Sequence, residues 1–280
     1  MINYLFYDIK NSIRNNKYKF LLFGLTIIVF YAFFIVECGV LTQSNKLSSS
    51  PTIADGAIYM LRGMYEYHPE LGDPFEIPVS WLIIQVFISF TVDKYMNDGF
   101  EGIGQQLLLR SKKKRNWFLG KLLYCLSTII IFYLIIGLIL GVGALLGYTS
   151  FSFLPSSDVC LYMSDINEES TMLLNAQNVL IYVIVLPMVT SFVISVGQVL
   201  LSIIFKPLIS FVIVIIYQVC SAYFSLSFFI GTYSMVLRSR YCSYGGYTIG
   251  TALRAEIILF SCLILASVFK LKKQDFLVRK

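Results

Sequence analysis

The sequence predicts an all-α integral membrane protein with six transmembrane helices, an amphipathic N-terminal interfacial helix and an outer re-entrant hairpin before the last span. Two observations predict this class. Of the 280 residues, 57% are hydrophobic and 14% are charged, whereas soluble domains carry about 25% charged residues. The charged residues also cluster between apolar segments of roughly 20 residues, the length that a membrane-spanning helix needs. We therefore expect residues 1–280 to form one transmembrane domain rather than a soluble helical protein.

Residues 1–17 precede the first apolar segment and are expected to form the interfacial helix. Their apolar side chains recur at helical spacing with polar side chains between them, which is typical of a helix on the inner membrane surface. A helix packed on protein is the alternative. The first apolar segment is long enough to span the membrane, so we interpret it as a retained helix and not as a cleaved signal peptide.

Six apolar segments are expected to span the membrane: residues 20–41, 79–95, 118–148, 178–205, 208–223 and 249–269. Pro187 predicts a kink in the fourth span. The third span carries two pairs of glycines four residues apart, which would let another helix approach closely. Simple flexibility is the alternative explanation for these glycines, which are Gly137, Gly141, Gly143 and Gly147.

Three segments are expected on the outer side. Residues 42–78 and 149–177 form large polar loops, and the first has helical potential over residues 58–67. Residues 224–248 are too polar to span and too apolar for a free loop, so we predict a hairpin shielded by protein. An aromatic and acidic surface in the first loop would suit a cationic amphipathic peptide, although a plain capping domain is the alternative; its residues are Tyr59, Tyr65, Glu66, Tyr67, Glu70, Asp73 and Glu76.

The lysines and arginines predict the orientation. With six spans, the cations before the first span, around residues 94–121, at Lys206 and after the last span all fall on one side of the membrane. Because positively charged loops stay in the cytoplasm, both termini are expected there. The expected location is the plasma membrane.

Three charged residues fall inside predicted spans, near their outer ends. Glu37, Arg254 and Glu256 would either reach the headgroups or shape an outer gate, with Glu37 and Arg254 paired. Cys160 and Cys242 are both expected outside, where oxidation to a disulfide is permitted.

The sequence lacks the motifs of several functional classes. There is no P-loop for nucleotide phosphates, and His68 is the single histidine, so no histidine-based zinc site is expected. We expect no metal, no cofactor bound by this chain, no nucleic-acid partner and no catalytic residues. The absence of a row of buried acidic residues disfavours a proton-coupled carrier.

The segment that joins the second and third spans, residues 98–121, carries the most information. An apolar stretch, Leu107, Leu108 and Leu109, precedes a basic run over residues 112–115. A solvated cytoplasmic loop, held on the inner side by its positive charge, would explain the basic run. In such a loop the three leucines would be exposed unless a membrane or a partner covers them.

This segment resembles the inner loop of type-2 ABC exporter permeases, the ABC-2 family. The similar features are an acidic residue, a glycine, a Leu-Leu pair, a basic residue and a Leu-Gly-Lys sequence. The segment departs from the family pattern in being a few residues shorter and in lacking the usual proline after the leucine pair. The residues that carry the resemblance are Glu101, Gly104, Leu107, Leu108, Arg115, Leu119, Gly120 and Lys121.

The resemblance implies a permease subunit of an ATP-driven exporter. Two separate P-loop ATPase subunits would bind ATP and Mg²⁺, and a second permease subunit, identical or related, would complete the path. We expect peptide or antimicrobial cargo. The alternative is a stand-alone membrane protein for bacteriocin immunity or membrane stress that binds without transport. The residues implied in contacting the ATPase are Asp98, Glu101, Gly104, Leu107, Leu108 and Leu109.

Overall fold

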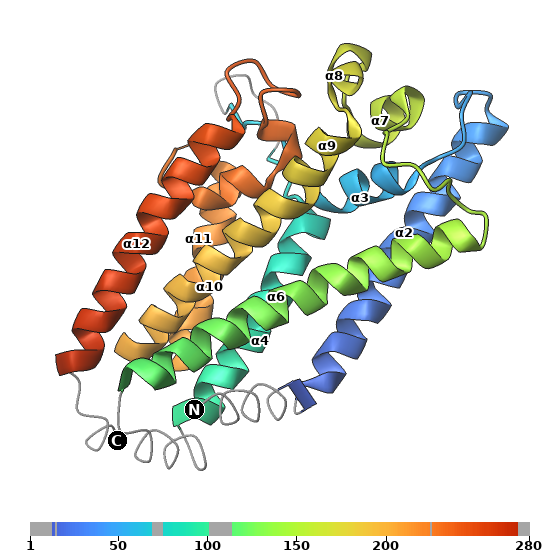
Figure 1. Cartoon of the computed structure of the whole chain (residues 1–280). Coiled ribbons are helices and arrows are strands. Elements are labelled where there is room, and N and C mark those ends of the chain that lie inside the picture. Colours follow the sequence, from blue (N-terminus) through green and yellow to red (C-terminus); the bar gives the residue numbers. More distant parts are fainter. Residues whose placement is uncertain (1–12, 15, 69–74, 101–113, 225, 274–280) are drawn as a thin grey trace.

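The protein is a bundle of long helices with short helices and loops gathered at one end (Figure 1). The computed structural model describes residues 13–14, 16–68, 75–100, 114–224 and 226–273. Within these ranges there are two isolated β-bridges and no β-sheet. The helices are α2 (Lys17–Gln43), α3 (Ile53–Leu61), α4 (Val79–Phe100), α6 (Lys114–Leu145), α7 (Ser157–Ser164), α8 (Glu168–Leu173), α9 (Ala176–Val179), the π-helix η2 (Leu180–Val185), α10 (Leu186–Ile204), α11 (Pro207–Tyr223), the 3-10 helices η3 (Ile230–Ser234) and η4 (Val236–Arg238), and α12 (Ile249–Lys273).

Five of these helices are long and apolar enough to cross a membrane, so the chain is a multi-pass membrane protein. They are α2, α4, α6, the continuous α9–η2–α10 helix and α12. The fifth predicted span, residues 208–223, corresponds to α11, which has 17 residues and is shorter than the other five helices. At about 1.5 Å per residue, α11 is some 26 Å long, close to the lower limit for a spanning helix.

The ends of the long helices agree with the predicted spans to within a few residues. The start of α2, the end of α4, the start of α6 and the end of α12 lie at one end of the bundle (Figure 1). The opposite end carries α3, α7, α8 and the segment between α11 and α12. For brevity these ends are called the basic end and the loop end. The predicted interfacial helix, residues 1–17, falls almost entirely outside the described residues.

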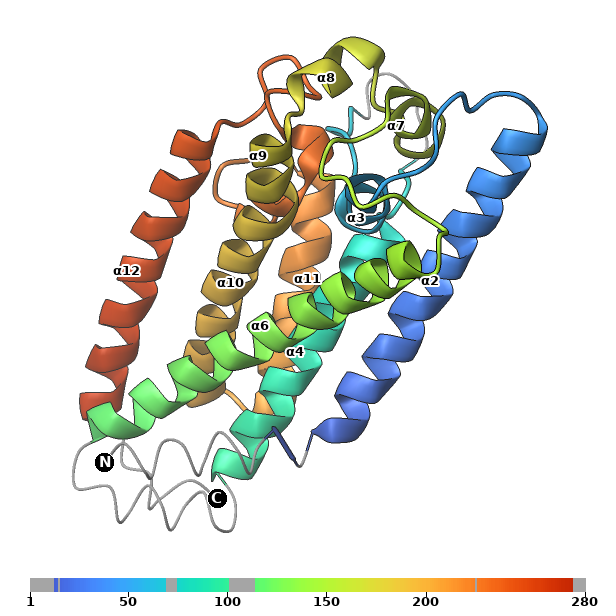
Figure 2. The same cartoon turned by 45° about the vertical axis from the view of Figure 1, so that its right-hand side comes forward.

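The long helices differ in how deeply they are buried. Most of α10 is buried, and it contacts α4, α6, α11 and α12. In contrast, α2 and α12 lie at opposite sides of the bundle (Figures 1 and 2). Few of the residues in their apolar segments are buried. Helix α6 crosses the bundle at a steep tilt (Figure 2). The length of its 32 residues exceeds the thickness of the hydrocarbon core, and the tilt accommodates this excess length.

The helix that contains Pro187 is irregular where the sequence predicts a disturbance. The π-helix η2 ends at Val185, two residues before the proline. Proline has no backbone N–H and its ring clashes with the preceding turn. A wider π turn is one of the local adjustments that relieves this clash.

The glycines of the two predicted pairs in α6 have different surroundings. At Gly143, the Cβ atom of an alanine would stand 2.0 Å from the hydroxyl oxygen of Tyr31 on α2. Gly137 and Gly141 have no atom within 4 Å of such a Cβ, apart from the helix's own backbone. Gly147 has a φ of +83° and ends α6 with a hydrogen bond from Tyr148 N to Gly143 O of 3.0 Å. Only Gly143 therefore provides the expected close helix approach.

The helix expected over residues 58–67 lies earlier, as α3. Thr52 and Asp55 form a capping box that begins the helix at Ile53, because each side chain accepts a hydrogen bond from the other's backbone N–H. The helix ends before Gly63, which has a φ of +73°. The sequence pattern of apolar side chains was misleading here because capping determines where a short helix begins.

The segment between α11 and α12 folds onto the loop end of the bundle. Its two 3-10 helices bury Ile230, Tyr233, Met235, Val236 and Leu237. Neighbouring protein therefore covers this irregular backbone, as its apolar composition requires.

We predict that Gly143→Ala destabilises the protein by about 1–3 kcal/mol, the usual range for overpacking a core. The new methyl group would displace the buried Tyr31 ring and its 3.2 Å hydrogen bond to Thr149 Oγ1. Thermal unfolding in detergent measures the effect. The matched control is Gly141→Ala, which meets no atom beyond its own helix backbone and should leave the transition unchanged or raise it. Equal behaviour of the two variants would contradict the α2–α6 contact.

We predict that Lys46 at the loop end is external and Lys206 at the basic end is cytoplasmic. Single cysteines would replace each lysine in a chain without accessible native thiols. In intact cells an impermeant thiol reagent should label a cysteine at 46 and not one at 206. Permeabilised cells provide the control, because both positions are exposed and both should then react. The reverse pattern in intact cells would invert the proposed orientation.

Candidate functional site

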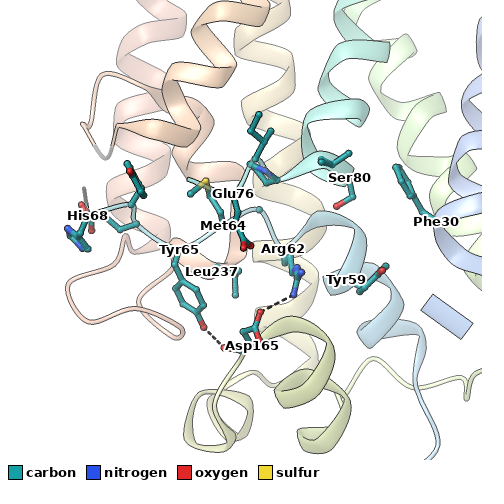
Figure 3. Close-up of a pocket in the computed structure, with 16 residues that line it drawn as sticks. Phe30, Tyr59, Arg62, Met64, Tyr65, His68, Glu76, Ser80, Asp165 and Leu237 are labelled. Carbon is teal, nitrogen blue, oxygen red and sulfur yellow. Dashed lines mark hydrogen bonds and ion pairs between the residues drawn. The ribbon is translucent and has the colours of Figure 1, made fainter. Parts of the chain in front are cut away.

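A hollow of about 630 Å³ lies at the loop end. It extends from the middle of α2, across the start of α4, to the segment that follows α3 (Figure 3). Such a volume is typical of sites for small ligands or a few peptide residues. Its lining is formed by Phe30, Tyr59, Arg62, Gly63, Met64, Tyr65, Glu66, Tyr67, His68, Glu76, Ile77, Pro78, Val79, Ser80, Asp165 and Leu237. We call it the outer pocket.

Contacts with α7 hold one wall of the outer pocket. Arg62 forms an ion pair of 3.5 Å with Asp165 and donates a 2.6 Å hydrogen bond to Met163 O. Tyr65 donates from its hydroxyl to Asp165 O at 2.7 Å (Figure 3). Gly63 permits the sharp turn after α3, since its Cβ would collide with Met235. The two outer loops are thereby fixed to each other.

The outer pocket has an excess of acidic groups. Three carboxylates line it, and its one arginine, Arg62, already has Asp165 as its partner. The other two carboxylates belong to Glu66 and Glu76, both exposed. The pocket therefore favours positively charged groups on electrostatic grounds.

Aromatic and aliphatic side chains form the rest of the outer pocket. Phe30 lies about midway along α2, some 20 Å from the helix end at Gln43 at 1.5 Å per residue. Ile77 and Val79 form an exposed apolar rim where α4 begins. Phe30 and His68 lie at opposite extremes of the pocket (Figure 3). One end of the pocket is therefore apolar and reaches bilayer depth, whereas the other is polar and lies among the loops.

A second hollow of about 270 Å³ adjoins the segment between α11 and α12. Glu66 lines both hollows. The other residues of this second hollow are mainly hydroxyl-bearing side chains and glycines, together with Arg238: Leu226, Ser227, Thr232, Tyr233, Arg238, Ser243, Gly245, Gly246, Tyr247, Thr248 and Thr251. We call it the hydroxyl pocket.

Arg238 is a buried cation that fixes the floor of the hydroxyl pocket. Its guanidinium donates to Ser221 O at 2.8 Å and to Ala222 O, both at the C-terminal end of α11. A weaker contact of 3.4 Å joins it to Tyr65 O. Burial lowers the pKa of Arg238 to about 10, and the nearby Glu66 carboxylate partly offsets this. The cation satisfies carbonyls that a helix end leaves without partners.

The interior between α4, α10 and α11 contains polar side chains at bilayer depth. Gln85 donates to Ser191 Oγ at 3.0 Å, and Gln198 donates to Ser89 O at 2.9 Å. Gln218 on α11 is fully buried, and within the described structure its amide makes no hydrogen bond. Polar side chains in a membrane interior are costly and commonly mark functional positions.

A buried lysine joins α4 to α6 at the basic end. Lys121 is 3% exposed, and its Nζ lies 3.5 Å from the ring centroid of Tyr95 and 5.3 Å from that of Trp117. Tyr95 stacks on Tyr124 at a centroid distance of 3.6 Å. Asn16, just before α2, donates to the Tyr124 hydroxyl at 3.1 Å. We call these five residues the inner clamp. The sequence contained Gly120-Lys121 as a motif but gave no signal for its aromatic partners.

Of the residues implied in contacting the ATPase, Asp98 lies in the last turn of α4. Glu101, Gly104, Leu107, Leu108 and Leu109 lie outside the described residues. Their proposed role therefore stays a prediction.

The predicted pairing of Glu37 with Arg254 is wrong. Both side chains are exposed, and they belong to α2 and α12 on opposite sides of the bundle (Figure 1). Sequence spacing could not show that the first and last long helices are separated by the others. Glu256 faces the interior of the bundle: it is 1% exposed and accepts a hydrogen bond from Thr190 on α10. These residues do not form an outer gate together.

The predicted disulfide between Cys160 and Cys242 is not formed, since both are free thiols. Cys160 is buried in α7 and its Sγ lies 3.6 Å from a carboxylate oxygen of Asp55. Burial and this carboxylate raise the pKa of the Cys160 thiol, and burial raises that of Cys242 to about 11. High pKa values keep both groups as unreactive thiols. Among the described residues no group of three or more potential ligands could hold a metal ion.

We predict that Arg238→Met destabilises the protein by about 2 kcal/mol or more, because it leaves buried carbonyls of α11 without donors. Arg240→Met is the matched control, since Arg240 is exposed two residues away. Thermal unfolding in detergent should show a lowered midpoint only for the Arg238 variant. An unchanged midpoint would mean that these hydrogen bonds contribute little.

Comparisons with known proteins give a family without a described activity. No curated protein matches the chain. No solved structure matches it either. Residues 75–277 match the family DUF2705, described as a protein of unknown function. This match begins just before α4 and continues to the last helix, so it covers four of the five inner-clamp residues (Asn16 lies outside it), α10 and the segment between α11 and α12. Because it extends over more than half of the chain, this multi-pass membrane protein belongs to the DUF2705 family.

Proposed function

We propose that the chain is the permease subunit of an ATP-driven exporter, with six spans that include α11 and with both termini in the cytoplasm. Two P-loop ATPase subunits would bind at the basic end, and a second permease subunit would complete the translocation path. The chain itself would hold no ATP and perform no hydrolysis. The proposed cargo is a peptide or antimicrobial compound. The resemblance of residues 98–121 to the inner loop of type-2 ABC exporter permeases supports this assignment.

The inner clamp is the observation that carries the proposal. Residues 101–113 connect the end of α4 to the start of α6, and the clamp joins these two helix ends. Lys121 from α6 contacts the Tyr95 ring from α4, and Tyr124 from α6 stacks on the same ring. A force applied to the connecting segment would therefore move α4 and α6 together. Cation–π contacts that are shielded from water are worth about 2 kcal/mol, enough to make this link firm.

Such a movement would act on the helix contacts in the interior of the bundle. Helix α4 contacts α10 and α11 across the buried polar side chains Gln85, Gln198 and Gln218. Hydrogen bonds between membrane helices contribute on average only about 0.6 kcal/mol, so alternative pairings of these amides have similar energies. An interface of this kind suits a bundle with two arrangements that an ATPase biases.

The first experiment tests attachment of the ATPase. The chain is co-expressed and co-purified with candidate P-loop ATPase subunits. Leu108→Asp should lower ATPase retention by about tenfold or more, because apolar anchors dominate binding at interfaces. Leu173→Asp, an equivalent change at the exposed loop end, is the control and should retain the ATPase. Failure of the unmodified chain to retain any such subunit would favour the stand-alone binding protein instead.

A second variant separates attachment from coupling. Tyr95→Leu removes the ring that contacts Lys121 and Tyr124 but leaves Leu108 unchanged. It should keep ATPase retention and lose cargo-stimulated hydrolysis in lipid vesicles. Normal retention also serves as the control for folding. Full stimulation in this variant would exclude the inner clamp as the coupling element.

A further inference from the structure

We propose that the outer pocket captures a cationic amphipathic peptide from the outer leaflet of the membrane. The location and lining of the pocket carry this inference, whereas the fate of the peptide as cargo rests on the proposed function. Binding at this end would make the chain a receptor for peptides that are already outside the cell membrane. The protein would then remove or detect external peptides, and need not accept its ligand from the cytoplasm.

The shape of the outer pocket favours a ligand that lies partly in the membrane. Phe30 on α2 and the exposed Val79 on α4 place the apolar end between two membrane-spanning helices. Glu66 and His68 place the polar end among the outer loops. Amphipathic peptides lie with their apolar face at the boundary between headgroups and acyl chains. Their side chains would therefore meet the pocket in the orientation that its lining requires.

The charges that line the outer pocket favour a positively charged ligand. The carboxylates of Glu66 and Glu76 are exposed and have no ion-pair partner within 4.0 Å among the described residues. The outer pocket's own arginine, Arg62, is drawn toward Asp165 and the backbone of α7. Lysine or arginine side chains of a ligand would pair with the two glutamates. Tyr59, Tyr65 and Tyr67 offer aromatic faces for further cation–π contacts.

The hydroxyl pocket favours a peptide over a simple amine. Glu66 lines both hollows, so a ligand bound to it can extend from the outer pocket of about 630 Å³ into the hydroxyl pocket of about 270 Å³. Ser227 and Ser243 supply hydroxyl groups there. These groups suit the backbone amides of an extended chain, whereas a single-headed amphiphile has no polar group to place among them.

The experiment measures binding without an ATPase, so that its failure is separate from failure of the proposed function. The full chain in lipid nanodiscs is titrated with a dansylated Leu-Lys amphipathic peptide of about 12 residues. A Leu-Glu peptide of the same length controls for partition into lipid. Empty nanodiscs are titrated in parallel. Only the Leu-Lys peptide should show saturable binding that depends on the protein and weakens with salt.

Variants locate the site. Glu66→Gln and Glu76→Gln should each weaken binding by about fivefold, the effect of losing an exposed charge pair. Glu169→Gln on α8 removes an exposed carboxylate at the same end but outside both pockets, and it should leave the affinity unchanged. Equal weakening of peptide binding in all three variants would mean that only the overall charge of the protein matters. That result would overturn the proposal.

A competition experiment distinguishes a peptide ligand from a small cationic amphiphile. Dodecyltrimethylammonium has a cationic head and an apolar tail but no amide groups. It should displace the Leu-Lys peptide only at concentrations well above those of an unlabelled Leu-Lys peptide. Equally strong displacement by the detergent cation would assign the site to small amphiphiles and overturn the peptide assignment. Ser243→Ala in the hydroxyl pocket should weaken peptide binding and leave detergent binding unchanged.

Discussion

The structure depends on one constraint: inside a bilayer, backbone polar groups must find their partners within the protein. Long helices satisfy their own backbone, and this accounts for the five apolar spans. Wherever the chain leaves helical geometry, another part of the protein supplies the partner. The guanidinium of Arg238 fulfils this role at the end of α11.

The same constraint explains why polar side chains concentrate around α10. This helix is enclosed by four others, so its polar side chains need not face lipid. Ser191 pairs with Gln85 of α4, and Thr190 pairs with Glu256 of α12. The peripheral helices α2 and α12 instead present aliphatic and aromatic side chains outward. The polar interior and the apolar surface are those of a helical membrane protein.

The two ends of the bundle have different physical character. At the basic end, cations contact aromatic rings and backbone carbonyls: Lys121 contacts Tyr95, and Lys19 donates to Phe90 O at 2.6 Å. At the loop end, acidic and aromatic side chains surround two hollows that share Glu66. A connection between these ends runs through α4, which begins at the outer pocket and ends at the inner clamp. Helix α4 is therefore the natural route by which an event at one end would reach the other.

The sequence by itself determined the long helices. Apolar segments of spanning length are set by bilayer thickness, so residues 118–148 could be recognised as a span without knowing their neighbours, and α6 covers nearly all of that range. The aromatic and acidic character of residues 59–76 was also visible, because composition is local. The predicted span over residues 208–223 was already the shortest of the six, in agreement with the 17 residues of α11.

Only the tertiary structure decided which of these residues meet. Glu37 and Arg254 have opposite charges in suitable positions along their helices, yet the bundle places them on opposite sides. Arg238 lies within the predicted outer hairpin, and only folding shows that it is buried against carbonyls of α11 and beside Tyr65. The physical reason is the same in each case: helix formation depends on local sequence and on the bilayer, whereas contacts between helices depend on how all their surfaces pack at once.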